Sequence, residues 1–388
     1  MPKRHGKDNQ NRGGADKRSR PERRRKHLYL VLDDWKKGFS IHKIDADSSD
    51  SVSDSDDEQC PRAAVAGHLP EPPALRLEAP GPHVGMFHAT LGGKILVVTD
   101  TDFGQTPALV YDTETAALAS GPAVPAHLRR GFGVVVAAGE TLYAFSPPAC
   151  NEHHSFEAMS WAPPSPVPHD ARYPGEDGGR RWSWRTLPSP APPFNVDEII
   201  TSYALHPDGR TIFMTTSYLD RPNLQRSTYS FNTKYRVWRW HDWALPFRGQ
   251  GFFDGELDAW VGLHPDGYIC CCQVASDIGS ETPVELGASQ LDWQMVETES
   301  FHEGTERHLR ASLTYMGRSK FCLVESVIRE GAKARYPLGD DEGCMVHMTM
   351  FGLKYSHKGE LRTTNHQSKR SYRVSRHKDF FTPLALWV

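Results

Sequence analysis

Three consecutive cysteines, Cys270, Cys271 and Cys272, are the residues that most directly suggest metal or redox chemistry. They lie in an apolar run typical of a strand, in which successive side chains point to opposite faces. Cys270 and Cys272 should share one face and Cys271 the other, so the three thiolates cannot converge on one ion. Zinc sites usually draw on C-x-x-C-type knuckles, which this segment lacks. We interpret the triplet as a buried structural element.

The other clusters of metal-binding or catalytic residue types are also weak. The acidic segment GDDEG at 339–343 lacks the alternating ligands of a calcium loop, and we interpret it as a solvated loop. No G-x-S-x-G, P-loop or G-x-G-x-x-G motif occurs. Four histidines are candidate metal ligands, but none has the spacing of a zinc motif: His153, His154, His302 and His308. We therefore predict no catalytic residue, no metal site and no cofactor, and expect that the protein is not an enzyme.

Tryptophans form two alternating runs, in which alternation places the indoles of each run on one strand face. We interpret them as packing between sheets. The alternative is a stacking surface for single-stranded nucleic acid, but the charge of the body argues against it. The runs consist of Trp182 and Trp184, and of Trp238, Trp240 and Trp243.

The elements that must position these residues are β-strands separated by glycine turns. The turn sequence LHPDG occurs at 205–209 and again at 263–267, each time between apolar runs. Its glycine supplies the positive φ that a tight hairpin needs, and its Asp can cap the turn. The glycines expected in the first hairpin of each unit are Gly93, Gly139, Gly209, Gly267 and Gly317.

These turns recur at spacings of 46, 70, 58 and 50 residues, with about four strand-like runs in each unit. Irregular β repeats of this length predict a β-propeller, in which neighbouring sheets bury each other's faces. We predict an all-β propeller over residues 27–388, with six blades of about four antiparallel strands. Strands at 27–45 and 74–78 should supply most of the sixth blade. The C-terminal SYRVSR and FFTPLALWV segments should complete it and close the ring; seven blades or an irregular count is the alternative.

Charge is distributed very unevenly along the chain. Residues 1–26 carry about +8, residues 45–58 carry −7, and the formal net charge of the chain is −3. We predict a disordered basic tail over 1–26 and an acidic, Ser-rich loop over 45–64. In that loop Ser51, Ser53 and Ser55 each precede an acid by three residues, as acidophilic kinases require. We expect the loop to fold back on the tail, and phosphorylation to strengthen that pairing.

The order of the motifs resembles a known family. The segment ALVYDTETAAL at 108–118 resembles the strand pair of kelch repeats, and WSWRTLP and WRWHDWALP resemble the Trp-bearing outer strand of such blades. The kelch double glycine after the second strand is absent. The whole pattern is similar to a plant kelch-like β-propeller family, expanded chiefly in grasses, whose biochemical role is uncharacterised. The resemblance covers nearly everything after residue 26.

From these features we expect a non-enzymatic protein-interaction scaffold that binds its partner through exposed loops. The expected interaction residues are Arg129, Arg130 and Arg248, with the Pro/Gly-rich insertion at 162–180. One alternative is a small-ligand-binding or hydrolytic propeller that uses the channel mouth; convergent Asp, His or Arg side chains there would favour it. A second alternative is association with nucleic acid through the basic tail, although the body has only about −4 of charge and direct nucleic-acid binding is not expected.

The composition also predicts where the protein resides. Seven scattered cysteines do not form a disulfide framework, and no apolar run approaches the ~20 residues of a membrane helix. We expect a monomer without membrane contact, inside the cell in the nucleus, the cytoplasm or both. The tail matches a nuclear import signal read by an import receptor; a solvated tail without a reader is the alternative. The basic residues concerned are Lys17, Arg18, Arg23, Arg24, Arg25 and Lys26.

Deletion of residues 1–26 tests the import prediction. The truncated protein should lose its nuclear fraction, because the receptor would no longer find a basic cluster. Fluorescence microscopy of tagged full-length and truncated chains measures the change. An unchanged distribution would remove the import hypothesis.

Overall fold

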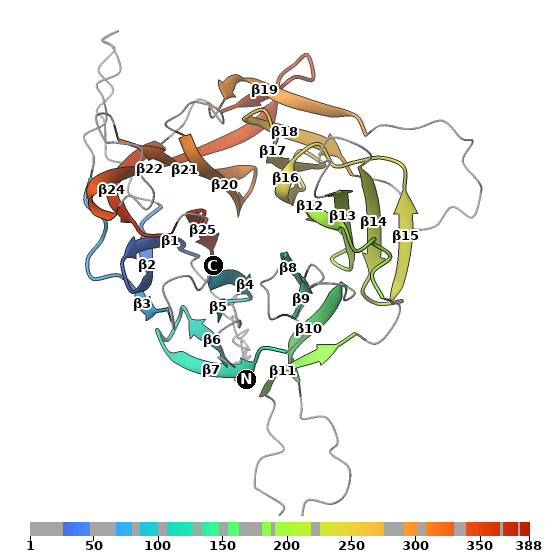
Figure 1. Ribbon diagram of the computed structural model, residues 1–388. Coiled ribbons are helices and arrows are strands. Elements are labelled where there is room, and N and C mark those ends of the chain that lie inside the picture. Colours follow the sequence, from blue (N-terminus) through green and yellow to red (C-terminus); the bar gives the residue numbers. More distant parts are fainter. Residues whose placement is uncertain are drawn as a thin grey trace, which may run out of the picture.

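Strands joined by turns make up the described chain. The computed structural model describes residues 26–46, 67–79, 86–99, 107–125, 128, 133–146, 154–162, 181–187, 191–218, 226–274, 291–300, 308–329, 339–364, 368–378 and 381–388. Figure 1 shows the sheets arranged around a common centre. No helix within these ranges is long and apolar enough to span a membrane. The all-β prediction is confirmed, and the architecture is that of a β-propeller.

Two sheets come from the N-terminal third and the C-terminus. The strands are β1 (Leu28–Trp35), β2 (Gly38–Ile44), β3 (Leu75–Glu78), β4 (Met86–Leu91), β5 (Lys94–Thr99), β6 (Pro107–Asp112), β7 (Leu118–Ala123) and β25 (Leu384–Trp387). The first sheet has the order β25–β1–β2–β3 and the second the order β4–β5–β6–β7. The predicted strands at 27–45 and 74–78 are thus confirmed.

The central part of the chain forms two further sheets. The strands are β8 (Val134–Ala138), β9 (Thr141–Ser146), β10 (Ser155–Ala162), β11 (Arg181–Thr186), β12 (Glu198–Leu205), β13 (Thr211–Tyr218), β14 (Ser227–Asn232), β15 (Val237–His241), β16 (Arg248–Asp254), β17 (Ala259–Leu263), β18 (Tyr268–Gln273) and β19 (Trp293–Ser300). One sheet has the order β11–β10–β9–β8. The other joins eight strands in the order β15–β14–β13–β12–β16–β17–β18–β19.

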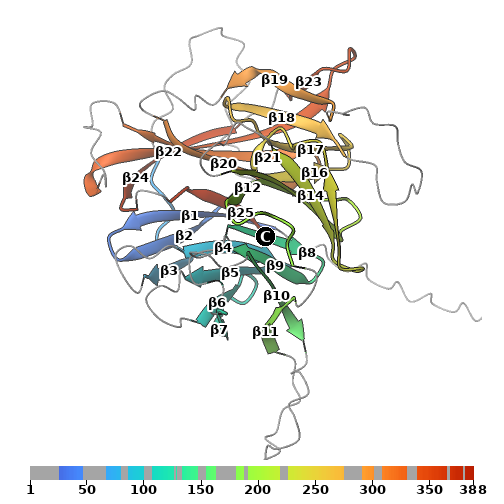
Figure 2. The same cartoon turned by 45° about the vertical axis from the view of Figure 1, so that its right-hand side comes forward.

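The last sheet is the most irregular. Its strands are β20 (His308–Gly317), β21 (Lys320–Ile328), β22 (Gly339–Tyr355), β23 (Leu361–Thr363) and β24 (Ser368–Arg376). The order is β20–β21–β22–β23, and β24 pairs separately with the long strand β22. Figure 2 shows β22 and β24 crossing above the sheet that contains β1.

Apolar side chains fill the space between neighbouring sheets. On β1, Leu28, Leu30 and Leu32 pack against β21, β22 and β24. The intervening Tyr29 and Val31 pack against β2, β5 and β25 on the opposite face. Because both faces of this sheet are covered, the strand is an unbroken apolar run rather than an alternating one.

The two ends of the chain meet in one sheet. β25 pairs antiparallel with β1, and the backbone groups of His27 and Val388 exchange two hydrogen bonds of 2.7 and 3.0 Å. The predicted pairing of the C-terminal segment with the N-terminal strands is confirmed for 384–387. It is wrong for SYRVSR, which lies in β24 and pairs with β22, because the unusual length of β22 offers that strand a second partner.

Glycine turns lie where the sequence predicts them, with two corrections. Gly139, Gly209, Gly267 and Gly317 all have positive φ, but at the first turn the positive φ falls on Gly92 and not on Gly93. The second LHPDG copy joins β17 to β18, so it closes the second hairpin of its unit and not the first. The sequence reading missed β16, whose glycine-rich start hides a strand.

The two LHPDG turns nevertheless have the same hydrogen bonds. In each, the glycine N–H donates to the histidine carbonyl, at 2.9 Å for Gly209 and 3.0 Å for Gly267. The aspartate N–H donates to the histidine Nδ1 at 3.2 Å in both copies. The pentapeptide is therefore a self-sufficient local turn that can serve at different places in a sheet.

A different turn recurs in the structure. An Asp or Asn side chain accepts hydrogen bonds from the backbone N–H groups two and three residues later, and the residue four positions later has positive φ. Four residues separate Asn232 from its partner Val237, and Asp254 from its partner Ala259, so this is a four-residue hairpin loop whose last residue is left-handed. The pairs are Asp112 with Ala116, Asn232 with Arg236 and Asp254 with Asp258. The kelch-like segment at 108–118 contains the first of them.

The packing of β25 generates a stability prediction. Leu386 is buried between β1 and β5, so Leu386→Ala should lower the free energy of unfolding by about 2–4 kcal/mol through the cavity it leaves. Leu118 on β7 is 46% exposed, and Leu118→Ala should cost less than about 0.5 kcal/mol. Urea denaturation compares the two variants. Equal losses would show that β25 does not contribute to the core.

Candidate functional site

A cavity of about 440 Å³ lies at the centre of the described structure. Residues of β4, β8, β12, β16, β20 and β25 line it, and Figure 1 shows these strands nearest the centre. Most of the lining is apolar or backbone. Tyr203, Arg248 and Gln250 bring polar side chains to one part of the wall. We call this cavity the central channel.

A β-bulge in β16 positions Arg248 on this wall. Arg248 pairs with Leu263 of β17, and the next pair along the ladder is Phe252 with Val261. The residues 249–251 leave that ladder and pair in parallel with β12 instead. Bulges are frequent where a strand must re-aim a side chain next to a site.

Phe247 fixes the position of the bulge. Its ring is fully buried and lies where side chains of two glycines would otherwise be. A Cβ at Gly251 would come within 2.1 Å of the ring, and one at Gly262 within 2.5 Å. The glycines next to Arg248 therefore allow the close approach that seats the bulge.

Two guanidinium groups lie close together here. Burial, and after it the charge of Arg248, lowers the pKa of Arg226. Arg226 donates from Nη2 to the Leu245 carbonyl at 3.0 Å. Arg248 is exposed and makes no hydrogen bond or ion pair with any residue in the described ranges. Two like charges thus lie together without an acidic partner from the described part of the chain.

Neighbouring groups are neutral. Burial raises the pKa of Tyr203 to about 12, so the phenol stays protonated; its hydroxyl donates to Gln250 Oε1 at 3.4 Å. Burial, with the charges of Arg226 and Arg248, lowers the pKa of His264, whose ring stacks on Trp293 at 5.0 Å. Among these groups, the positive charge at this wall therefore comes from Arg248.

His88 belongs to a different part of the channel wall. Its ring packs between Phe39 and Phe381, with centroid distances of 6.0 and 6.3 Å. Neither ring nitrogen has a hydrogen-bond partner among the described residues. Burial lowers the pKa of His88 to about 4, so the imidazole is neutral at physiological pH.

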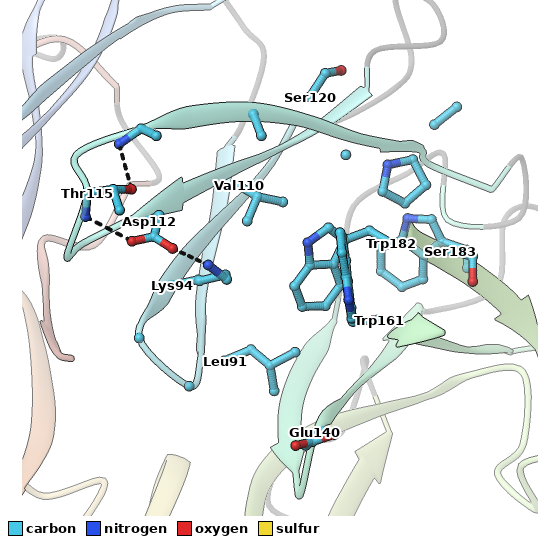
Figure 3. A pocket seen from close by; sticks show the side chains of 18 of the residues that line it. Leu91, Lys94, Val110, Asp112, Thr115, Ser120, Glu140, Trp161, Trp182 and Ser183 are labelled. Atoms are coloured by element: carbon cyan, nitrogen blue, oxygen red, sulfur yellow. Dashed lines mark hydrogen bonds and ion pairs between the residues drawn. The ribbon is translucent and has the colours of Figure 1, made fainter. Parts of the chain in front are cut away.

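A larger cavity, of about 1130 Å³, lies between the sheet of β4–β7 and the sheet of β8–β11. We call it the tryptophan pocket. Figure 3 shows Trp161 and Trp182 on one side and the Lys94–Asp112 ion pair on the other. Contact with Lys94 holds the pKa of Asp112 well below its usual range, so this carboxylate stays charged. Trp182 was predicted only as a packing residue, and no sequence motif indicated that Trp161 would join it.

Of the three predicted interaction arginines, the structure places Arg248 on the channel wall. Arg129, Arg130 and nearly all of the 162–180 insertion lie outside the described residues. So do Ser51, Ser53, Ser55 and the basic tail except Lys26, which is exposed. The structure therefore brings only Arg248 to a cavity. The electrostatic effect of Arg248 on Arg226 was missed, because the two are 22 residues apart in sequence.

The cysteine triplet is arranged as the alternation predicts. Cys270 and Cys272 join one buried cluster with Trp260, whereas Cys271 joins another on the opposite face. Burial raises the pKa of all three thiols, which disfavours the thiolate that redox or metal chemistry needs. Among the described residues no group of three His, Cys, Asp or Glu side chains could hold a metal ion.

The remaining predicted clusters are dispersed. His154 bonds through Nε2 to the Asn195 carbonyl at 2.8 Å, and His308 lies 3.6 Å from Glu325; His153 and His302 lie outside the described residues. The acidic segment 339–343 forms the start of β22, so its prediction as a loop is wrong. Gly339 pairs with Arg376 of β24, and Cys344 directly after the segment pairs with both β21 and β24, which explains why it is extended. Trp238 packs between sheets as predicted, but Trp240 is 61% exposed.

A family model described as "Protein of unknown function (DUF1668)" matches residues 25–372. The chain belongs to this family. The match says nothing about kelch repeats, plants or grasses, so those parts of the resemblance stay predictions. A search of curated proteins found no match.

Several solved propellers are similar to this DUF1668 chain at low identity. The periplasmic gluconolactonase PpgL of Pseudomonas aeruginosa has 12% identity and a TM-score of 0.45, with 94% of this chain and 99% of that chain covered. Apo AztD from Citrobacter koseri has 10% identity and a TM-score of 0.33, covering 93% and 98%. The Cps50 (Swd1) β-propeller domain of Myceliophteria thermophila has 10% identity and a TM-score of 0.34, covering 76% and 90%.

The expectation of a non-enzymatic interaction scaffold is wrong. The channel wall is not featureless. It gathers an arginine, a tyrosine and a glutamine, and cavities that collect a few polar groups are typical of ligand sites. The sequence reading erred because it could judge only loops, whereas this wall is built by strands distant in sequence.

The seating of Phe247 generates a second stability prediction. Gly251→Ala should lower the free energy of unfolding by about 1–3 kcal/mol, because its Cβ would overlap the Phe247 ring. The control is Gly255→Ala, where the nearest atom of Phe253 would lie 3.9 Å from the new Cβ. Thermal unfolding of both variants gives the comparison. Equal unfolding temperatures in the two variants would show that the glycine is not required at the bulge.

Proposed function

We propose that this protein is a small-ligand-binding propeller that takes a small organic anion, such as a carboxylate or a phosphate ester, at the central channel. The observation that carries the proposal is the exposed Arg248, which lines the channel together with Tyr203 and Gln250. A partly buried guanidinium group beside a second one is electrostatically costly, and a bound anion would offset that cost. Guanidinium groups also match carboxylate and phosphate oxygens in geometry.

The surroundings of Arg248 fit the same ligand class. The protonated Tyr203 hydroxyl and the Gln250 amide can hydrogen-bond ligand oxygens, because both lie on the same wall. A volume of about 440 Å³ lies in the range of small-molecule sites. The bulge presents Arg248 on a strand braced by buried Phe247, so the cation is held before a ligand arrives.

The lining favours binding over hydrolysis. The hydroxyls of Ser312 and Thr314 donate to the carbonyls of Pro383 and Ala385, at 2.8 and 2.6 Å, and are not directed to a base. The neutral His88 makes no hydrogen bond to either hydroxyl. An activated nucleophile needs such a contact. The described lining therefore supports ligand capture and not covalent catalysis.

We also propose that the sheets form six blades of kelch-like type. The eight-stranded sheet would count as two blades joined through β12 and β16. The innermost strands contact one another in the series β25, β4, β8, β12, β16, β20 and again β25, which supports this count. The Asp or Asn turn after β6 and after β14, each the third strand of its proposed blade, supports blades of related design.

Isothermal titration calorimetry with citrate and with inorganic phosphate tests the proposed function. At least one of them should bind, and Arg248→Gln should weaken that binding about tenfold or more, as expected when a charged hydrogen-bond donor is lost. Binding should also weaken as salt is added.

Arg239→Gln is the matched control, because Arg239 is exposed on β15 away from the channel. It should bind like the wild type. Absence of binding to both anions at about 1 mM, or equal losses in the two variants, would contradict the proposal.

A further inference from the structure

We propose that the tryptophan pocket is a second binding site, separate from the central channel, and that it takes hydroxylated ring compounds such as a short oligosaccharide. No residue lines both cavities, and the two are built on different parts of the sheets. Ligand binding at the tryptophan pocket does not depend on anion binding at the central channel.

The pocket exists because the two facing sheets carry side chains of unequal size. Near the centre, Leu91, Val110 and Met159 fill the space between the sheets. Towards the outer edge, β7 offers small residues while β10 and β11 offer indoles. Close packing would require large side chains on both walls. The small residues that line the pocket along this edge are Ala117, Ala119, Gly121 and Ala123.

The indoles form one continuous aromatic wall. Trp161 and Trp182 are directly paired across β10 and β11, and Trp184 pairs with Met159 two positions along. The rings of Trp161 and Trp182 are 5.4 Å apart at an interplanar angle of 64°. Trp161 is 47% exposed, which is costly for so large an apolar group without an occupant.

The side of the cavity opposite the indoles carries polar groups. Asp112 contacts Lys94 and accepts a hydrogen bond from the Thr115 N–H at 3.0 Å, as Figure 3 shows. A purely apolar ligand would remove water from these groups without replacing its hydrogen bonds.

Together the walls select the ligand class. Two indoles that are not coplanar can each hold the face or edge of a ring, so they suit a ligand with more than one ring. The charged pair Lys94 and Asp112 can both donate to and accept from hydroxyl groups. A volume of about 1130 Å³ is far too large for a single small ion. Linked, hydroxylated rings satisfy all of these conditions.

Calorimetric titration with cellohexaose, xylohexaose and maltohexaose tests this inference. At least one hexaose should bind, with quenching or a shift of tryptophan emission. Trp161→Ala should weaken the binding about tenfold or more, and Trp161→Tyr should retain part of it because an aromatic face remains. Since Trp161 is about half exposed, both variants should unfold at nearly the wild-type temperature.

Trp240→Ala is the matched control, since Trp240 is 61% exposed on β15 and lines neither cavity. It should bind the hexaose like the wild type, and so should Arg248→Gln, which separates this site from the anion site. The inference is overturned if no hexaose binds at about 1 mM, if Trp240→Ala weakens binding as much as Trp161→Ala, or if 1-naphthol binds in place of every hexaose.

Discussion

Each sheet of this protein has two apolar faces, and the whole structure depends on a neighbouring sheet covering each of them. β1 illustrates the constraint, because its side chains alternate between two buried clusters that belong to different neighbours. A sheet of this kind cannot be stable alone. The C-terminal strand β25 is therefore not an appendage: it pairs with β1 and places Leu386 in the same core.

Charges at the meeting point of the chain ends are satisfied internally. Asp33 accepts hydrogen bonds from the backbone N–H groups of His377 and Lys378, and Arg376 donates to the Phe381 carbonyl and to Ser326. Burial raises the pKa of Asp33 although Arg376 and these donors lower it. These partners of both charged side chains belong to the chain itself. Arg248 at the channel differs, because its side chain has no such partner among the described residues, and that difference distinguishes a structural charge from a charge placed for binding.

Both cavities arise from departures from regular sheet packing. At the channel, two glycines let the Phe247 ring approach the backbone, and the resulting bulge turns Arg248 to the wall. At the tryptophan pocket, small residues on β7 face the indoles and leave the space open. In neither case does the propeller fold alone create the cavity. It depends on unusually small side chains at particular positions of the sheets.

The sequence by itself determined the all-β class, most strand positions, the alternating faces of Cys270 to Cys272 and the pairing of the two chain ends. These follow from periodicity and turn chemistry, which act over a few residues. Only the tertiary structure decided that Arg226 and Arg248 meet, that Trp161 and Trp182 face a wall of small residues, and that the second LHPDG closes a second hairpin. Those outcomes depend on which strands become neighbours, and burial between sheets, which sets that order, acts between residues far apart in the chain.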